Sequence, residues 1–165
     1  MKLFFGETTE EPGMAKFDGL LGMRMPRIAI VFTTSLTSAI LDTGSSLIVM
    51  DEDEAARINA IIGAKEGKSL FGGKGPYTVE CGSVGSLPDV TFNMGGMKFT
   101  LSGKEYIFEM KSPFGGGTSC ASGFMGIKFP DHMKGMMILG DVILRKYVSI
   151  YDVEENRVGL VLSTE

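Results

Sequence analysis

Two apolar runs separated by a short polar turn place the strongest constraint on how this chain folds. They form the stretch AILDTGSSLIVM, which covers residues 39–50. Apolar residues on both sides predict buried strands, whereas Asp42, Thr43, Gly44 and Ser45 predict a polar turn at the end of the first strand. Taken by itself, Asp-Thr-Gly is explained by turn structure, because Asp and Thr side chains bond to nearby backbone and glycine supplies unusual backbone angles.

The composition favours one globular domain built mainly from strands. The chain has 165 residues, of which 44% are hydrophobic and 22% are charged, and this is enough for a single core. Its 23 glycines and 6 prolines, together with many short alternating runs, favour strands and tight turns over helices. We therefore predict a mainly β fold with one or two short helices.

Charge and motif content argue against several classes of partner and cofactor. The net charge is −4 and the basic residues are scattered, so we expect neither nucleic acid nor membrane as a partner. The apolar run near the N-terminus is too short for a signal peptide or a membrane span. Since the sequence has no zinc or phosphate-loop motif and a single histidine, His132, we expect no metal, no cofactor and no Ser-His-Asp triad, and we interpret His132 as an exposed loop residue.

Residues 51–66, DEDEAARINAIIGAKE, predict the one clear helix. The acidic residues at its start suit a helix N-terminus, and Gly63 stands where a helix typically ends. The predicted buried face consists of Ala55, Ile58, Ile61 and Ile62.

Alternating apolar residues predict two hairpins. The first places Val90, Phe92 and Met94 before the Gly95-Gly96 turn and Phe99 and Leu101 after it. The second places Val148 and Ile150 before EENR and Val158, Leu160 and Leu162 after it. We predict loops over residues 7–13, 67–77 and 112–120, and a buried turn and strand over residues 17–30.

Two further features concern segments far apart in the chain. FDGLLGM near the start and MMILGDV near the end both place two apolar residues before a glycine beside an aspartate, a similarity short enough to arise by chance in a glycine-rich chain. Cys81 and Cys120 are compatible with either a disulfide or two free thiols.

The surroundings of Asp42 resemble the pepsin family of aspartic endopeptidases, and within it the cathepsin D-like enzymes. The stretches YTVECGSVGSLPDVTFNMGG, SCASGFMGI and MILGDVILRKYVSIYDVEENRVGL follow AILDTGSSLIV in the family's order and spacing. Residues 38–165 resemble the C-terminal lobe, and residues 5–30 resemble a fragment of the N-terminal lobe. The resemblance implies a truncated peptidase domain over residues 1–165, with the fold of a single lobe of the pepsin-like double barrel.

The resemblance also implies roles for individual residues. Asp42 matches the second catalytic aspartate, Thr43 the threonine that braces the active-site loops, and Ser45 the hydroxyl that bonds the catalytic carboxylate, while Gly44 lets the backbone approach closely. Ile138, Leu139 and Gly140 match the segment that passes beside the catalytic loop. Cys81 and Cys120 match a disulfide of this lobe, which implies an oxidising compartment, and closing a loop of this length would stabilise the fold by about 3 to 4 kcal/mol.

Catalysis in this family needs two carboxylates, and this chain has one Asp-Thr-Gly. Two carboxylates close together have different pKa values, so that one is ionised while the other is protonated. The ionised one activates water as the base and the protonated one donates a proton. Aspartic peptidases are themselves the standard example of this effect. We considered three hypotheses. The chain is a fragment or isoform with half the site, from a splice form, a deletion or a partial gene model; it forms a homodimer like retroviral peptidases, with Asp42 from each copy; or it is a non-catalytic peptide-binding module.

Partners and compartment follow from the same resemblance. It implies a peptide or protein substrate and a lysosomal or secreted location, although we expect no signal peptide in this chain. The lobe surface that meets the other half in the family should be apolar and exposed. We therefore expect either self-association or the missing N-terminal lobe as a partner.

Overall fold

Strands dominate the structure, as the sequence predicts. The computed structural model describes residues 2–3, 29–32, 38–68, 74–94, 97–111, 117–154 and 157–163. The strands are β1 (Lys2–Leu3), β2 (Ala29–Phe32), β3 (Ser38–Leu41), β4 (Ile48–Asp51), β5 (Lys65–Lys68), β6 (Lys74–Val79), β7 (Asp89–Met94), β8 (Met97–Leu101), β9 (Ile107–Lys111), β10 (Thr118–Ser122), β11 (Phe124–Ile127), β12 (Met136–Leu139), β13 (Tyr147–Asp152) and β14 (Arg157–Leu162). The helices are α1 (Glu52–Ile61), the short α2 (Gly103–Tyr106) and α3 (Asp141–Leu144), and the 3₁₀ helices η1 (Cys81–Ser86) and η2 (Asp131–Met133).

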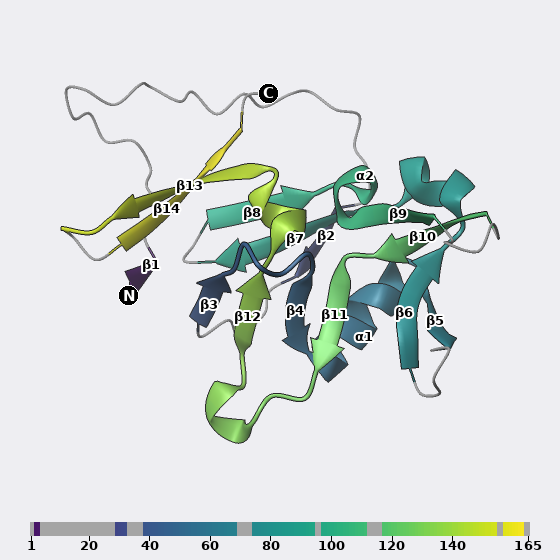
Figure 1. Cartoon of the computed structure of the whole chain (residues 1–165), viewed down its shortest axis with the longest axis horizontal. Coiled ribbons are helices and arrows are strands. Elements are labelled where there is room, and N and C mark those ends of the chain that lie inside the picture. The colour runs from purple at the N-terminus through teal and green to yellow at the C-terminus, as the bar shows by residue number, and fades with distance from the viewer. Residues whose placement is uncertain are drawn as a thin grey trace.

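The strands form four small sheets. Their orders are β1-β14-β13, β5-β6-β10-β9, β11-β4-β12-β3 and β2-β7-β8. In Figure 1 the β13–β14 hairpin lies at one end of the long axis and β5 and β6 lie at the other, with the β11-β4-β12-β3 sheet between them. This architecture confirms the prediction of a mainly β single lobe, with short helices besides α1.

The predicted helix is present and ends where expected. The side chain of Asp51 caps α1, because its Oδ1 accepts a hydrogen bond from the backbone N–H of Asp53 at 3.2 Å. Gly63 follows the helix with φ of 74°, in the left-handed region that favours glycine at this position.

One residue of the predicted helix face was assigned wrongly. Ala55, Ile58 and Ile62 are buried, but the Ile61 side chain is 48% exposed. The buried stripe follows the 3.6-residue period and takes in Asn59 instead, whose Nδ2 donates to the carbonyls of Ala55 at 2.9 Å and Phe124 at 3.1 Å. Asn59 therefore ties α1 to β11.

Both predicted hairpins are present. β7 pairs with β8 so that Phe92 faces Phe99, and β13 pairs with β14 so that Val148 faces Val161. The turn at residues 95–96 lies outside the described residues, as do residues 7–13 and 17–28, where we predicted a loop and a buried turn. Thus neither FDGLLGM nor most of the region that resembles an N-terminal lobe is described.

Two predicted loops extend over residues that belong to strands. The interval 67–77 overlaps the end of β5 and the beginning of β6, and residues 117–120 include the start of β10. The sequence of β5 is KEGK, which has no apolar alternation, so its pairing with β6 is what makes it a strand. Residues 69–73 and 112–116 lie outside the described parts of the chain.

An aromatic cluster at the centre of the core supports the strand that follows Asp42. The ring of Phe124 lies 6.0 Å from that of Phe92 and 5.2 Å from that of Tyr106, centroid to centroid. Gly123, next to Phe124, donates its N–H to the Tyr106 carbonyl at 2.7 Å and accepts from the N–H of Ile48 at 2.9 Å. The start of β4 is therefore bonded to the core.

Candidate active site

Asp42 begins the turn between β3 and β4. The backbone N–H of Ser45 donates to the carbonyl of Asp42 at 3.2 Å, which closes the turn. Thr43 and Gly44 are exposed, whereas Asp42 and Ser45 are partly buried. The polar turn predicted between two apolar strands is thus present, and it brings Asp42 to the end of β3.

Both oxygens of the Asp42 carboxylate receive a hydrogen bond from within the turn. Oδ1 accepts from the backbone N–H of Gly44 at 2.9 Å, and Oδ2 accepts from the hydroxyl of Ser45 at 2.6 Å. The Ser45 bond, followed by the Gly44 bond, lowers the pKa of Asp42 below its ordinary value of 3.8, against a smaller opposing effect of desolvation. The carboxylate therefore stays ionised into acidic solution.

Strand β12 lies between β3 and β4 and is hydrogen-bonded to the start of the turn. It pairs in parallel with β3, where Leu139 faces Leu41, and antiparallel with β4, where Leu139 faces Ile48. The backbone N–H of Asp42 donates to the carbonyl of Leu139 at 3.0 Å. Figure 1 shows β12 lying between the other two strands. The structure thus brings Ile138, Leu139 and Gly140 beside Asp42.

Gly140 lies so close to this turn that its position has no room for a larger residue. A Cβ atom added there would lie under 3.0 Å from the carbonyl oxygens of both Ser45 and Leu47. Both are backbone atoms, which cannot rotate away. The absence of a side chain at Gly140 is therefore what lets β12 run into α3 against the turn.

Sequence reasoning missed two contacts just beyond this strand. The N–H of Asp141 donates to the carbonyl of Ser45 at 2.9 Å, and the N–H of Val142 donates to that of Ser46 at 3.2 Å. Both residues lie in the first turn of α3, where N–H groups have no partner within the helix. The backbone N–H groups at the start of any helix are available as donors, which was the one usable signal. We did not predict a helix at residues 141–144, so we did not apply it.

The described part of the chain brings no second carboxylate into hydrogen-bonding contact with Asp42. The hydrogen bonds that its side chain accepts there come from Gly44 and Ser45. Within the same residues, no group of three or more His, Cys, Asp or Glu side chains is placed to hold a metal ion. None of the described helices is long and apolar enough to cross a membrane. His132 is exposed, as predicted, but it lies in the 3₁₀ helix η2 and not in a loop.

Two of the sequence assignments belong neither to this turn nor to the segment of β12 beside it. Cys81 and Cys120 form a disulfide with Cα atoms 5.2 Å apart, which confirms the pairing implied by the family resemblance. It links η1 to β10.

The comparison with protein families shows to which family this chain belongs. Residues 29–162 match the family model described as eukaryotic aspartyl protease, and this span includes the Asp42 turn, β12 and both cysteines. The chain belongs to the eukaryotic aspartyl protease family. It is therefore related to aspartic endopeptidases, which are hydrolases, and the pepsin-like, cathepsin D-like resemblance is confirmed.

Individual relatives of this aspartyl protease chain are considerably longer than it is. It is 43% identical over 124 residues to a vacuolar protease A of Aspergillus fumigatus. This match covers 75% of this chain and 28% of that protein. It is 40% identical over 126 residues to a cathepsin D of Clupea harengus. This match covers 76% of this chain and 30% of the cathepsin D. The chain thus spans less than a third of the length of these two proteins.

A third match extends over nearly the whole chain. Cathepsin D of Canis lupus familiaris is 30% identical over 239 residues, covering 97% of this chain and 57% of that protein. Because the matched region is longer than the 165 residues of this chain, part of the cathepsin D sequence within it has no counterpart here.

Proposed function

We propose that Asp42 is one of the two catalytic carboxylates of an aspartic endopeptidase and that this chain holds the C-terminal half of that site. The observation that carries the proposal is the double hydrogen bonding of the Asp42 carboxylate by Gly44 and Ser45. It favours the ionised form, which is the form that activates water. In this proposal Ile138, Leu139 and Gly140 position the turn, and the exposed Thr43 contacts the other half.

A single carboxylate that is held ionised can act as the base but cannot also donate a proton. The reaction of the family therefore requires a second carboxylate from elsewhere. We propose that it comes from the N-terminal lobe, of which residues 5–30 are a fragment, and that residues 38–165 form the C-terminal lobe. The matched region of cathepsin D is longer than this chain, as expected if part of the N-terminal lobe has no counterpart here.

Apolar side chains on the β13–β14 hairpin are suited to meeting that second half. Val148 and Ile150 are exposed on one face of the hairpin, where Val148 faces Val161, whereas Leu162 is exposed on the other face, where it faces Tyr147. Exposed apolar groups clustered in this way favour association with another protein surface. We propose that this hairpin contacts the missing lobe, or a second copy of the chain in its absence.

The substrate and compartment follow from the relatives. We propose a peptide or protein substrate, since the relatives are proteases, and a vacuolar, lysosomal or secreted location, since the Aspergillus relative is named a vacuolar protease. The disulfide supports assembly in an oxidising compartment.

A mixing experiment tests the proposed role of Asp42. The full chain is assayed at acidic pH for cleavage of an unfolded protein, alone and after mixing with an N-terminal lobe from a cathepsin D relative. We expect cleavage only in the mixture, and we expect Asp42→Asn to abolish it while Asp131→Asn, a change at an exposed residue in η2, leaves it unchanged.

The other outcomes separate the remaining hypotheses. Cleavage by the chain alone that rises with the square of its concentration and is lost in Asp42→Asn would indicate a homodimer. Cleavage that survives Asp42→Asn would contradict a catalytic role for this residue. A stable mixed complex without cleavage would indicate a peptide-binding module.

A further inference from the structure

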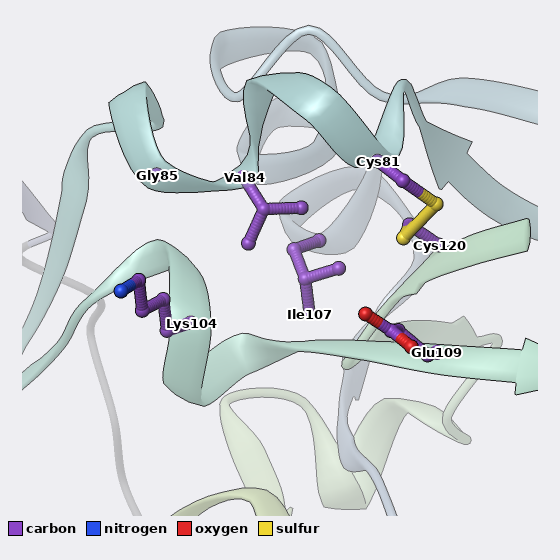
Figure 2. A pocket seen from close by; sticks show the side chains of 7 residues that line it. All are labelled: Cys81, Val84, Gly85, Lys104, Ile107, Glu109 and Cys120. Atoms are coloured by element: carbon purple, nitrogen blue, oxygen red, sulfur yellow. A yellow bond between two sulfur atoms is a disulfide. The ribbon is translucent and has the colours of Figure 1, made fainter.

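A pocket opens beside the disulfide, away from the Asp42 turn. Its cavity volume is about 440 Å³, and its lining includes Cys81, Cys120, Val84, Ile107, Lys104 and Glu109. Figure 2 shows the two sulfur atoms at one side of this space, with Val84 and Ile107 projecting into it. Cavities of this size admit small molecules.

The two halves of the disulfide differ in accessibility. Cys120 is 1% exposed in the middle of β10, whereas Cys81 is exposed at the start of η1. We therefore expect an incoming thiolate to attack the exposed residue, Cys81, rather than the buried Cys120. Access and the identity of the attacked sulfur both control the rate of thiol–disulfide exchange.

The charges around the pocket favour one class of thiol. Glu109 pairs directly with Cys120 across β9 and β10, and Figure 2 shows its carboxylate on the side of the pocket nearest the disulfide. Lys104 lies toward the opposite side in the same view. A cationic thiol approaching the disulfide is attracted by the nearer carboxylate, and an anionic thiol is repelled.

We infer that Cys81 is a site of reversible thiol–disulfide exchange with small cationic aminothiols, which enter through this pocket. The inference is independent of any role for Asp42. It rests on the unequal exposure of the two cysteines, on the pocket that both of them line, and on the position of Glu109 opposite Cys120.

The exchange balances without an additional oxidant. The aminothiol loses its proton to water, and its thiolate sulfur forms a new bond to the Sγ of Cys81. The bond between the two cysteine sulfurs breaks, and its electron pair leaves on the Sγ of Cys120, which then takes a proton from water. The reverse attack by Cys120 restores the disulfide and releases the aminothiol.

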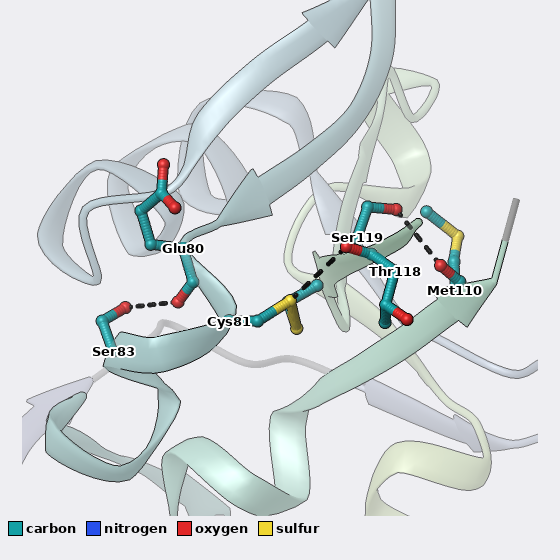
Figure 3. The surroundings of a disulfide bond; sticks show 7 residues. Glu80, Cys81, Ser83, Met110, Thr118 and Ser119 are labelled. Carbon is teal, nitrogen blue, oxygen red and sulfur yellow. Dashed lines mark hydrogen bonds between the residues drawn. A yellow bond between two sulfur atoms is a disulfide. The ribbon is translucent and has the colours of Figure 1, made fainter. Parts of the chain in front are cut away.

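The structural consequence is local, because β10 has other partners. Cys120 stays paired with Val79 of β6 and with Glu109 of β9 after the disulfide opens. In Figure 3, η1 continues from Glu80, whose carbonyl accepts from the Ser83 hydroxyl at 2.7 Å. Exchange therefore releases η1 from β10 while the sheet remains.

The Thr118 carbonyl gives a released Cys81 thiol a place to bond. The Sγ of Cys81 lies 3.9 Å from the Thr118 oxygen (Figure 3). A disulfide sulfur carries no proton, so this is only a contact in the oxidised state. A Cys81 thiol after full reduction would have a weak S–H donor to direct at that oxygen.

Peptide mapping of the native protein tests where exchange occurs. The full chain is incubated with cysteamine at mildly alkaline pH, quenched with acid and digested under non-reducing conditions for mass spectrometry. We expect the cysteamine adduct on Cys81 and a free thiol at Cys120. An adduct found equally or mainly on Cys120, or exchange no faster than global unfolding, would overturn the inference.

The charge preference is tested separately with a matched pair of variants. Rates per thiolate are compared for cysteamine, neutral 2-mercaptoethanol and anionic mercaptoethanesulfonate. We expect Glu109→Gln to lower the ratio of the cationic to the anionic rate roughly threefold, as expected when one unit charge about 10 Å away in water changes the two rates in opposite directions. Glu154→Gln, in the distant turn after β13, should leave the ratio unchanged. Equal ratios in all three proteins would exclude a role for Glu109.

Discussion

The hydroxyl of Ser45 donates a 2.6 Å hydrogen bond to the Oδ2 of Asp42. It is the leading reason why the pKa of Asp42 lies below 3.8. A residue three positions along the same turn therefore controls the ionisation of the proposed catalytic group.

Removing this hydroxyl should raise the pKa of Asp42 toward 3.8. We expect Ser45→Ala to shift the titration of the Asp42 carboxyl upward, because only the Gly44 bond then favours its charged form. NMR titration of the side-chain carboxyl carbon measures the change. Ser46→Ala is the matched control, since it leaves both bonds to the carboxylate in place. An unchanged pKa in Ser45→Ala would show that another group holds Asp42 ionised.

A side chain at Gly140 should disrupt the close packing of the end of β12 against the Asp42 turn. We expect Gly140→Ala to destabilise the lobe by about 3 kcal/mol or more, because its Cβ would overlap backbone oxygens of Ser45 and Leu47. Gly82→Ala provides the control, as a Cβ at Gly82 meets nothing within 4 Å, and its effect should stay within about 0.5 kcal/mol. Urea unfolding followed by circular dichroism measures both. Equal unfolding midpoints would contradict the close approach.

Acid should weaken the ion pair between Glu105 and Lys146, whose charged atoms lie 2.9 Å apart. Partial burial raises the pKa of Glu105, but hydrogen bonds from Lys146 and Ser102 outweigh this and leave the pKa below 4.5. A depressed carboxyl pKa stabilises the folded state above pH 4.5, and this stabilisation is lost as the pH falls through the lower value of the folded state.

Replacing Glu105 should therefore lower the free energy of unfolding at neutral pH and leave it unchanged in strong acid. We expect Glu105→Gln to lower the free energy of unfolding by about 1 kcal/mol at pH 7, a small value because the Glu105 and Lys146 side chains are 34% and 24% exposed. The difference should vanish in strong acid. Asp131→Asn removes a more exposed ion pair with Lys134 and serves as the control. A Glu105→Gln deficit that persists undiminished in strong acid would contradict this account.

Charge placed on the β13–β14 hairpin should reduce self-association. We expect the chain to associate through exposed apolar residues there, and Val148→Lys to shift it toward the monomer. Ile61→Lys, at an exposed position on α1, should not have this effect. Light scattering over a concentration series measures the mass. A wild-type chain that stays monomeric at all concentrations would argue against an association surface.

Local patterns in the sequence predicted local structure well. The Asp42 turn, α1 with Gly63 after it, and both hairpins depend on residues close together in the chain, so spacing and turn chemistry were sufficient. Ile61 was misplaced because an apolar side chain was preferred over Asn59, whose amide finds the carbonyls of Ala55 and Phe124.

A readable signal was missed at α2. Ser102 and Glu105 form a capping box, with the Glu105 carboxylate accepting from the backbone N–H of Ser102 at 2.6 Å. Ser-Gly-Lys-Glu is the usual spacing for this motif. Lys146, the ion-pair partner of Glu105, lies 41 residues further along the chain, and no local pattern connects these two residues.

Contacts between distant segments needed more than local patterns. The pairing of β12 with β3 was anticipated only from the family resemblance, because apolar strands alone do not specify their neighbours. The contacts of Asp141 and Val142 were not anticipated at all.

The position of β12 has a consequence for how the protein folds. The N–H of Asp42 bonds to the carbonyl of Leu139, so the proposed catalytic turn is completed by residues almost a hundred positions further along. Closing so long a loop is slow, since chain entropy is lost before the contact forms. During synthesis, the gap between β3 and β4 must stay open until β12 has been made. The Asp42 turn therefore reaches its final geometry among the last parts of the lobe.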